Sequence, residues 1–330
     1  MQHAAAGDAD ADDGEKYLQG RHVTLVTAEG VTHHPPRERL ERMRDDHTFF
    51  WLDVHEPLPS DVANLADVMH LHPLVLEDLA EFGQRPKVDT YGDHALVVAF
   101  GAATDEDQLV EVHSVVGPTW LITLHRDDCV AFPPLYRRIE RGARPAGPLQ
   151  ALYRVLDALT DSFFPLLEAW DERVDEIQNE IFAEPRDEHM REVFAVKRRL
   201  IGVRRVVSPQ RDVFAQLAAG TVDLPALDQD SRRYFRDVYD HMIRLADMVD
   251  TQRDLLTGVI DVYLGMVGNR RDQVMKQLTL IATIFMPLTF ITGFFGQNFG
   301  WMEAGIGSWW AFAVASLAQL GVLVGAVLTF

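Results

Sequence analysis

Two apolar stretches without a charged residue dominate the C-terminal end of the sequence. They run from Leu278 to Gly296 and from Ser308 to Phe330. Stretches of about 20 apolar residues match the roughly 30 Å hydrocarbon core of a bilayer. A pair of buried core helices is the alternative, but such helices seldom run this long without a charge. The pattern therefore predicts two transmembrane helices, a first span that ends at Gly296 and a second span over residues 308–330.

Residues 21–147 show a different pattern, in which strand-like and helix-like segments alternate. Segments rich in β-branched and aromatic residues predict strands at 22–28, 49–56, 94–102, 109–116 and 119–125. Two segments with helical spacing begin after Ser or Pro and predict helices at 59–73 and 73–82. We therefore expect an α/β domain with a mixed sheet over residues 21–147.

Helical spacing then continues from Pro148 to about Leu217, with breaks predicted at 183–188 and near 206–212. Acidic residues three or four positions apart share a face of the first part: Asp157, Asp161, Glu168, Asp171, Glu172, Asp175, Glu176 and Glu180. Basic residues follow on the next part: Lys197, Arg198, Arg199, Arg204 and Arg205. We expect residues 148–230 to form a stalk of antiparallel helices of opposite charge. A dedicated ion site on the acidic face is the alternative.

A third helix is predicted from Ser231 into the first span, because no proline occurs before Pro287. If it is continuous over residues 231–296, it is about 100 Å long at 1.5 Å per residue. Positions spaced alternately by three and four along this helix form one stripe, which we call the seam: Asp254, Gly258, Asp261, Gly265, Gly268, Asp272, Met275, Thr279, Ala282, Met286, Thr289 and Gly293.

The seam is unusual because it is small or acidic where an ordinary coiled coil places Leu, Ile or Val. Small residues allow close helix contact, whereas acids on a shared axis are costly unless water or cations occupy it. A tight bundle with a few tolerated charges is the alternative. We predict instead that several copies surround a wet, cation-attracting axis that narrows at Met275 and Met286, since a ring of Met can exclude water. Cyclic symmetry follows, because one copy supplies one such helix.

Charge and composition set the topology and exclude some partners. The formal net charge of −19 argues against nucleic-acid binding, which requires a basic face. Residues 1–20 are acidic, lack the features of a signal peptide, and predict a disordered tail. Arg270, Arg271 and Lys276 precede the first span, while the linker at 297–307 contains no Lys or Arg, so the soluble part is predicted to be cytoplasmic and the linker external. The single Cys129 fits a reducing compartment.

An enzymatic function has little support in the sequence. No phosphate-binding loop, dinucleotide fingerprint or nucleophile elbow is found. Two histidine pairs, His33 with His34 and His70 with His72, are read as exposed loop residues in preference to metal ligands.

Two separate segments, residues 234–299 and 73–100, closely resemble the CorA family of divalent-cation transporters. The resemblance covers most of the chain from about residue 40. It implies a homopentameric funnel in the bacterial plasma (inner) membrane that takes up Mg²⁺, with Co²⁺ and Ni²⁺ as further substrates. It also implies a Gly-Met-Asn selectivity loop after the first span, which here reads Gly296-Gln297-Asn298. A ring of neutral amides can hydrogen-bond a hydrated Mg²⁺ without stripping its water.

The resemblance further implies a regulatory cation site between subunits. Its matching positions are Asp78, with Glu77 beside it, and Asp237, with His241 one turn further on. The departure at Gln297 leaves Zn²⁺ or proton-coupled transport open as an alternative within the superfamily. A membrane-anchored ion sensor that conducts nothing is the alternative from another class. Members of the family usually end in a basic cytoplasmic tail, whereas this sequence ends at Phe330.

Overall fold

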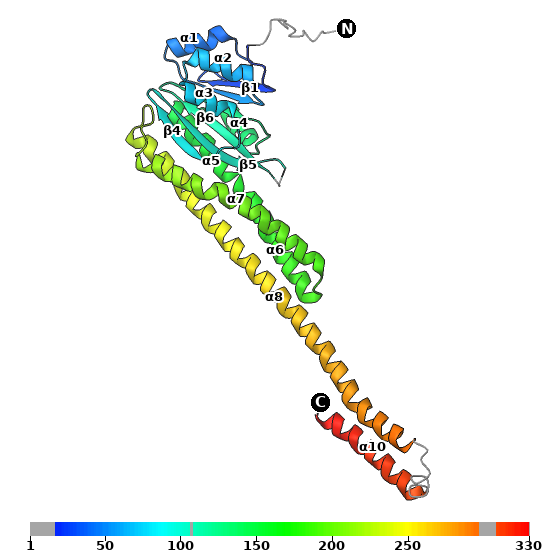
Figure 1. Cartoon of the computed structure of the whole chain (residues 1–330). Helices are drawn as coiled ribbons and strands as arrows, with labels where there is room; N and C mark the ends of the chain where they lie inside the picture. The colour runs from blue at the N-terminus through cyan, green and yellow to red at the C-terminus, as the bar shows by residue number, and fades with distance from the viewer. Residues whose placement is uncertain (1–16, 106–107, 297–307, 330) are drawn as a thin grey trace, which may run out of the picture. The chain divides into compact units, whose positions relative to one another are not determined.

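The computed structural model describes residues 17–105, 108–296 and 308–329 (Figure 1). The chain divides into two compact units. The first combines Met1–Ile177 with Arg191–Thr257, and the second combines Gln178–Met190 with Gly258–Phe330.

The first unit contains a seven-stranded sheet. The strands are β1 (His22–Thr27), β2 (Val31–His33), β3 (Phe50–His55), β4 (Lys87–Tyr91), β5 (His94–Ala102), β6 (Leu109–Val116) and β7 (Trp120–His125). Their order is β2-β1-β3-β7-β6-β5-β4. Among the described strands β3 and β7 pair in parallel and the other neighbours are antiparallel, which confirms the predicted mixed sheet.

Short helices accompany the sheet: α1 (Arg37–Asp45), α2 (Pro59–Met69), α3 (Pro73–Ala80) and α4 (Phe132–Glu140). The two predicted helices correspond to α2 and α3, which both begin at proline, a residue suited to the first turn because its missing N–H needs no partner there. The helix α5 (Pro148–Asp161) packs against β3, β5, β6 and β7.

The predicted acidic tail is too long by four residues. Leu18 is buried, the Tyr17 hydroxyl donates to the Asn64 carbonyl at 2.6 Å, and the Gln19 amide donates to Asp61 at 2.6 Å. Residues 17–20 therefore belong to the folded domain, because Leu18 finds an apolar site and the neighbouring polar groups are paired. Residues 1–16 lie outside the described part of the chain.

Three helices follow α5: α6 (Phe163–Ala183), α7 (Asp187–Ala219) and α8 (Gln229–Phe295). The predicted break at 183–188 is confirmed, since α6 ends at Ala183. A further break that the sequence pattern did not indicate separates α5 from α6 at Ser162, whose hydroxyl donates to the Leu159 carbonyl and accepts from the Ala102 amide.

The predicted break near Pro209 is wrong, because α7 continues through this proline. An interior proline costs about 3 kcal/mol. Here the next residue offsets that cost: the fully buried Gln210 accepts from the Phe100 amide at 2.7 Å and donates to the Phe100 carbonyl at 3.2 Å. Tertiary packing on β5 therefore overrides the local signal.

Charge pairing between the stalk helices differs in part from the prediction. Arg173 of α6 pairs with Glu192 of α7, the reverse of the expected polarity, whereas Glu180 of α6 lies 3.3 Å from His189 Nε2 of α7. In the basic part of α7, Arg204 lies 2.8 Å from Asp250 of α8. The acids Asp171, Glu172, Asp175 and Glu176 are exposed.

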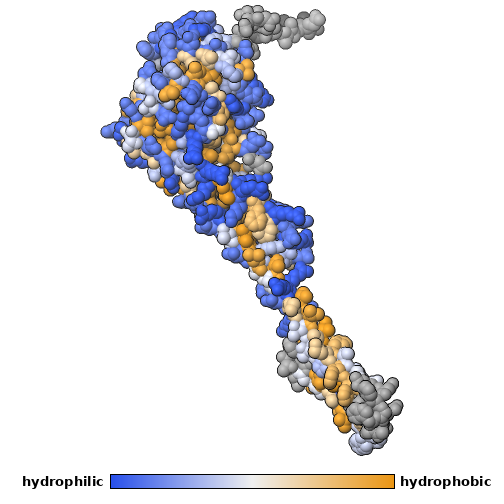
Figure 2. Space-filling model, viewed as in Figure 1, coloured by the Kyte–Doolittle hydropathy of each residue, from blue (hydrophilic) through white to orange (hydrophobic). Residues whose placement is uncertain are grey.

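The long helix α8 is continuous through Pro287, as predicted. It is the one helix of the described residues that is long and apolar enough to cross a membrane. None of its most apolar segment is buried. A buried core helix therefore does not describe this segment in the single chain. The helix α10 (Trp309–Thr329) matches the second predicted span and is apolar from Trp309 to Gly325. Figure 2 shows a largely apolar surface over the C-terminal part of α8.

Candidate cation sites

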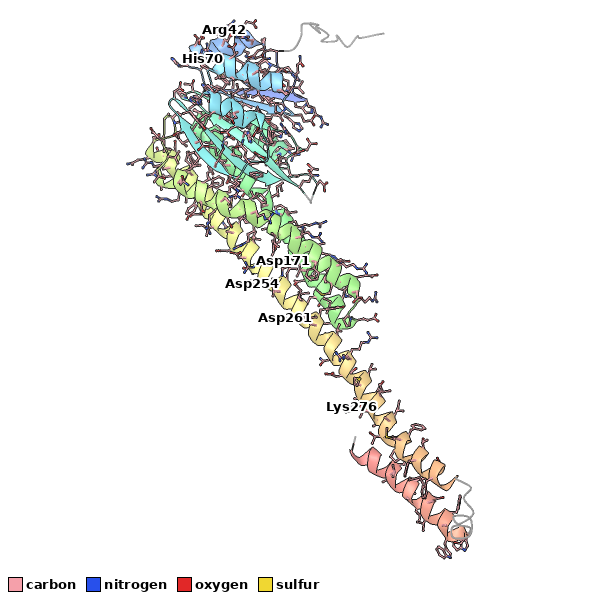
Figure 3. The ribbon with its side chains drawn as sticks, viewed as in Figure 1. Arg42, His70, Asp171, Asp254, Asp261 and Lys276 are labelled. Atoms are coloured by element: carbon pink, nitrogen blue, oxygen red, sulfur yellow. The ribbon has the colours of Figure 1, made fainter. Side chains whose placement is uncertain are left out.

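The seam lies on the face of α8 that the described chain leaves uncovered. Its members are exposed, except for Gly268, which is half-buried. In contrast, Leu256, Val259 and Tyr263 on the opposite face are buried. Asp254 and Asp261 mark the acidic part of the seam along α8 (Figure 3). A single chain therefore presents a continuous face of small and acidic side chains with no partner helix on it in the described structure.

Burial does not distinguish the seam within the apolar part of α8. Met275 and Met286 are exposed, but so are Ile281 and Phe285, which fall off the seam. The assignment of Asp261, Asp272, Met275, Thr279, Ala282, Met286, Thr289 and Gly293 to a pore therefore stays a prediction.

The predicted selectivity loop is described only at its first residue. Gly296 follows the last residue of α8, and its amide donates to the Thr292 carbonyl at 2.9 Å. Gln297 and Asn298 lie outside the described residues.

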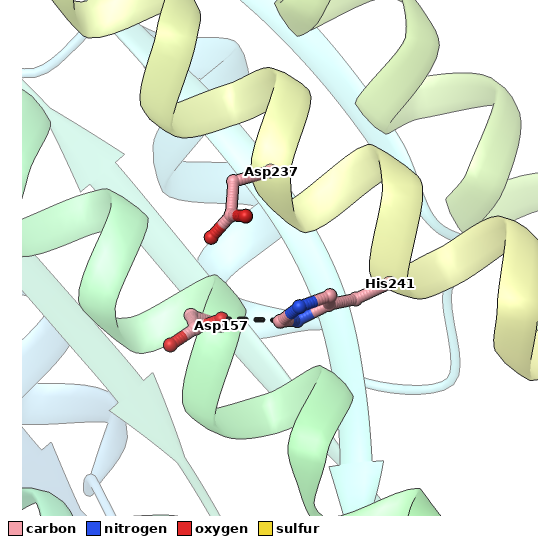
Figure 4. Close-up of side chains that lie close together, drawn as sticks. All are labelled: Asp157, Asp237 and His241. Atoms are coloured by element: carbon pink, nitrogen blue, oxygen red, sulfur yellow. Dashed lines mark ion pairs between the residues drawn. The ribbon is translucent and has the colours of Figure 1, made fainter.

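A cluster of possible metal ligands joins α5 to α8. One ligand atom from each of Asp157, Asp237 and His241 lies within 4.8 Å of the others (Figure 4). His241 Nδ1 lies 3.5 Å from Asp157 Oδ1 and 3.6 Å from Asp161 Oδ1. Asp237 Oδ2 accepts a hydrogen bond from the Tyr153 hydroxyl at 3.1 Å. The i, i+4 spacing places Asp237 and His241 on one face of α8, as predicted.

Two atoms of this cluster lack hydrogen-bond partners in the described structure, namely Asp157 Oδ1 and His241 Nδ1. Both are buried, and buried polar atoms normally have partners. Burial and the nearby Asp161 carboxylate raise the pKa of Asp157, while His241 opposes that shift. A divalent cation between these atoms would satisfy both of them and offset the repulsion between the carboxylates.

The chemistry of the donors fits such an ion. Carboxylate oxygens suit Mg²⁺, and imidazole suits Zn²⁺, Ni²⁺ and related metals. Sequence reasoning found Asp237 and His241 but assigned Asp157 only to an acidic helix face. The sequence carried no signal that would place it against a helix 80 positions later, because that contact depends on how α5 packs.

Asp78 and Glu77 lie on α3 and are not members of this cluster. Asp78 Oδ2 instead lies 2.7 Å from Lys87 Nζ, and Glu77 is exposed. Partial burial would lower the pKa of Lys87, but hydrogen bonds to Asp78 and Asp89 outweigh it and raise that pKa. The prediction that Asp78 meets Asp237 concerns two copies of the chain, so it stays a prediction.

Two of the four histidines that the sequence analysis weighed as metal ligands, His70 and His72, are exposed residues between α2 and α3, as expected. The His72 ring accepts from the Leu74 amide and caps α3, and the His70 ring lies 3.1 Å from Arg44 Nη1. His33 belongs to β2 and not to a loop. None of them is part of a metal-competent group in the described residues.

A separate polar network is enclosed in the sheet around Asp53. This buried carboxylate accepts from the hydroxyls of Thr123 and Tyr136 and lies 3.4 Å from His125 Nε2. The His125 ring stacks on His55 with 4.6 Å between centroids. Burial would lower the pKa of His125, but Asp53 outweighs it and raises that pKa, whereas burial and His125 lower the pKa of His55. When His125 is protonated, it forms an interior ion pair with Asp53.

Comparison with known proteins agrees with this architecture. The family model described as CorA-like Mg²⁺ transporter protein matches residues 46–330. The cobalt/magnesium transport protein CorA of Thermotoga maritima is 35% identical over 294 residues, which cover 87% of this chain and 83% of that protein. The zinc transport protein ZntB of an Enterobacter species is 28% identical and covers 84% of both chains.

The fold is also that of a solved transporter. The complete structure of the CorA magnesium transporter from Methanocaldococcus jannaschii superposes with a TM-score of 0.78, at 21% identity, and covers 94% of this chain and 96% of that chain. This likeness supports the fold: a soluble α/β domain, followed by stalk helices that include one very long helix. The chain therefore belongs to the CorA-like Mg²⁺ transporter family, a family of transporters of divalent metal ions and not of enzymes.

Proposed function

We propose that this chain is one subunit of a homopentamer that conducts Mg²⁺, and with it Co²⁺ and Ni²⁺, into the cell across the plasma membrane. The observation that carries the proposal is the uncovered seam of α8, which continues without a break from its acidic part into the apolar span. The choice of ions follows the Thermotoga relative, which is named as a cobalt/magnesium transport protein.

A ring of copies turns this seam toward a common axis. Asp254, Asp261 and Asp272 then raise the local concentration of cations. Glycines at Gly258, Gly265 and Gly268 leave room for hydrated ions or for close helix contact. In the span, the Met275 and Met286 rings close the path by excluding water. The helix α10 is the second span and lies on the lipid side of α8.

The mouth of the path is formed by Gly296, Gln297 and Asn298. Their neutral amides hold a hydrated ion by hydrogen bonds to its water, so the ion is neither dehydrated nor trapped by charge. The soluble domain lies in the cytoplasm, and the mouth faces the outside, as the distribution of Lys and Arg indicates.

Internal Mg²⁺ gates this path at cytoplasmic sites. Asp78 and Glu77 of one subunit face Asp237 and His241 of the next, and Asp157 adds an oxygen ligand from the same subunit as Asp237. A bound cation offsets the repulsion of these carboxylates and stabilises the closed ring, so a high internal concentration shuts entry. This coupling requires that the closed state binds the ion better than the open state.

Zinc transport is the second candidate, and two observations favour it. The imidazole of His241 lies in the only metal-competent group found in the described residues, and imidazole is a better ligand for Zn²⁺ than for Mg²⁺. A relative named as a zinc transport protein covers 84% of this chain. In this reading Gln297 alters the ion preference of the mouth.

The test is ion flux into proteoliposomes at a fixed membrane potential, measured separately for Mg²⁺, Co²⁺, Ni²⁺ and Zn²⁺. Potential-driven Mg²⁺ flux supports the first candidate. Flux of Zn²⁺ alone supports the second. An assembled protein that passes none of these ions is a sensor and not a transporter.

A further inference from the structure

Lys87 pairs with Asp78, the residue that the proposed function makes a ligand of the regulatory ion. It is the first residue of β4, which forms one edge of the sheet. Its ammonium lies 2.7 Å from Asp78 Oδ2 and 3.2 Å from Asp89 Oδ2. The side chains of Lys87 and Asp78 are 30% and 22% exposed, so the pair is partly shielded from water. A tethered ammonium and a free cation compete for the same carboxylate oxygens.

The backbone that carries Asp78, the other residue of this ion pair, is held by hydrogen bonds. The Asp78 carbonyl accepts from Gln84 Nε2 at 2.7 Å, and the Glu81 carbonyl accepts from the same amide at 2.8 Å. The Gln84 backbone amide in turn donates to the buried carboxylate of Glu111 at 3.1 Å. The segment between α3 and β4 is therefore held by hydrogen bonds, whereas the four-carbon stem of Lys87 is flexible. Lys87 is the partner that can leave.

We propose that Lys87 is the tethered counter-ion of the regulatory cation site. Its ammonium neutralises Asp78 when no cation is bound and leaves Asp78 when a divalent cation arrives. Lys87 therefore sets the internal concentration at which the channel closes. The inference rests on the proposed function, in which Asp78 is a ligand of the regulatory ion.

The geometry explains why a lysine suits this task. A strongly hydrated point charge on a flexible stem can exchange with another hydrated cation, whereas arginine would hold a carboxylate through two parallel hydrogen bonds. Asp89 gives the displaced ammonium a second carboxylate, so its charge stays compensated after it moves. The site thus remains weak, as a sensor of an abundant ion requires.

The experiment compares Lys87→Met with the wild-type full-length protein. Removing the competing ammonium should lower the internal Mg²⁺ concentration for half-inhibition of flux by about twofold to fivefold, the range expected for one partly exposed charge pair. The Mg²⁺ concentration that protects α8 from proteolysis should fall by the same factor. Lys197→Met, the same substitution on α7, serves as the control and should change neither value.

Two further variants keep the test decisive. Lys87→Gln repeats the loss of charge with a polar side chain, in case Lys87→Met does not assemble. In an Asp78→Asn background, Lys87→Met should have no further effect, because the two residues act on one site. The inference is overturned if the Mg²⁺ concentration for half-inhibition is unchanged or raised in both Lys87→Met and Lys87→Gln. It is also overturned if Lys87→Met shifts that concentration equally in the Asp78→Asn background. In both cases the gating mechanism stands. A wild-type protein that Mg²⁺ neither inhibits nor protects overturns both.

Discussion

At the scale of single residues, neutral amides and charged groups have separate tasks in this account. In the proposed function, Gln297 and Asn298 bring hydrogen-bonding capacity without charge to the mouth of the path. Asp157, Asp237 and His241 would bring charge and a metal-binding nitrogen to the regulatory cluster. A ring of charged side chains at the mouth would hold a divalent ion too tightly to release it. A sensor site without charge would not bind one.

Asn298 is therefore expected to matter more than Gln297. Asn298→Ala should abolish Mg²⁺ flux in proteoliposomes, because the amide that contacts the hydrated ion is lost, and assembly should be unchanged. Gln297→Met, which restores the usual family loop, should keep flux and alter ion preference. Unaltered transport in Asn298→Ala would contradict the role given to the loop.

The interior network around Asp53 makes a prediction about pH. The folded state raises the pKa of His125, so the ion pair with Asp53 contributes its full stability below the ordinary histidine pKa of about 6.5. That contribution is lost as pH rises through the folded-state value. His55 and Asp128 lie beside the His125 imidazole. Because His125 lowers the pKa of His55, replacing His125 also removes that part of the His55 shift.

The measurement is the thermal midpoint of wild type and His125→Gln between about pH 6 and pH 8. The difference should be largest at the acid end and shrink toward the alkaline end. A difference that stays constant with pH would show that His125 acts by packing alone.

The sequence could identify some site residues but not their partners. Asp237 and His241 follow from their spacing on one helix. Asp157 does not, because its contact with His241 depends on how α5 packs against α8. The pairing of Lys87 with Asp78 also needs the path of the chain between α3 and β4, which no periodicity encodes.

At the scale of elements, long segments with a clear strand or helix pattern were predicted correctly, whereas short segments were missed. The apolar and β-branched segments of β3, β5, β6 and β7 identify them as strands, and the uninterrupted helical spacing identifies α8. The short strands β2 and β4 were not predicted, because they lie at the sheet edges and are only partly buried. Pro209 predicted a break that the contact of Gln210 with β5 overrides.

That contact can be tested directly. Gln210→Ala leaves the buried amide and carbonyl of Phe100 without their side-chain partner, which should lower the free energy of unfolding by about 1–3 kcal/mol. Gln216→Ala, at an exposed position of the same helix, is the matched control and should change stability by less than about 0.5 kcal/mol. Equal denaturation midpoints for the two variants would show that Gln210 does not hold α7 to the sheet.

At the scale of the whole molecule, the proposed function depends on the uncovered face of α8. The seam is exposed, and none of the most apolar segment of α8 is buried in the described chain. In the proposed function several copies surround one axis, and each contributes its α8. We predict a cyclic pentamer, which native mass spectrometry from detergent should show as a dominant species of five chains. A spectrum of monomers and dimers alone would contradict it.

The central claim is that the seam of α8 lines the cation path, and cysteine accessibility tests it most directly. The only native cysteine, Cys129, is buried, so the background reaction with a water-soluble thiol reagent is low. Two pairs of positions have similar exposure in the single chain. Met275 and Ile281 are both 52% exposed, and Met286 and Phe285 are 72% and 62% exposed.

Within each pair only the methionine lies on the seam. The reagent should therefore modify Met275→Cys and Met286→Cys in assembled, open channels and block Mg²⁺ flux, because these positions line the path and water reaches them when it opens. Ile281→Cys and Phe285→Cys should resist modification and retain flux, because they face lipid or protein. Block at the two control positions, with the seam positions unaffected, would contradict the account.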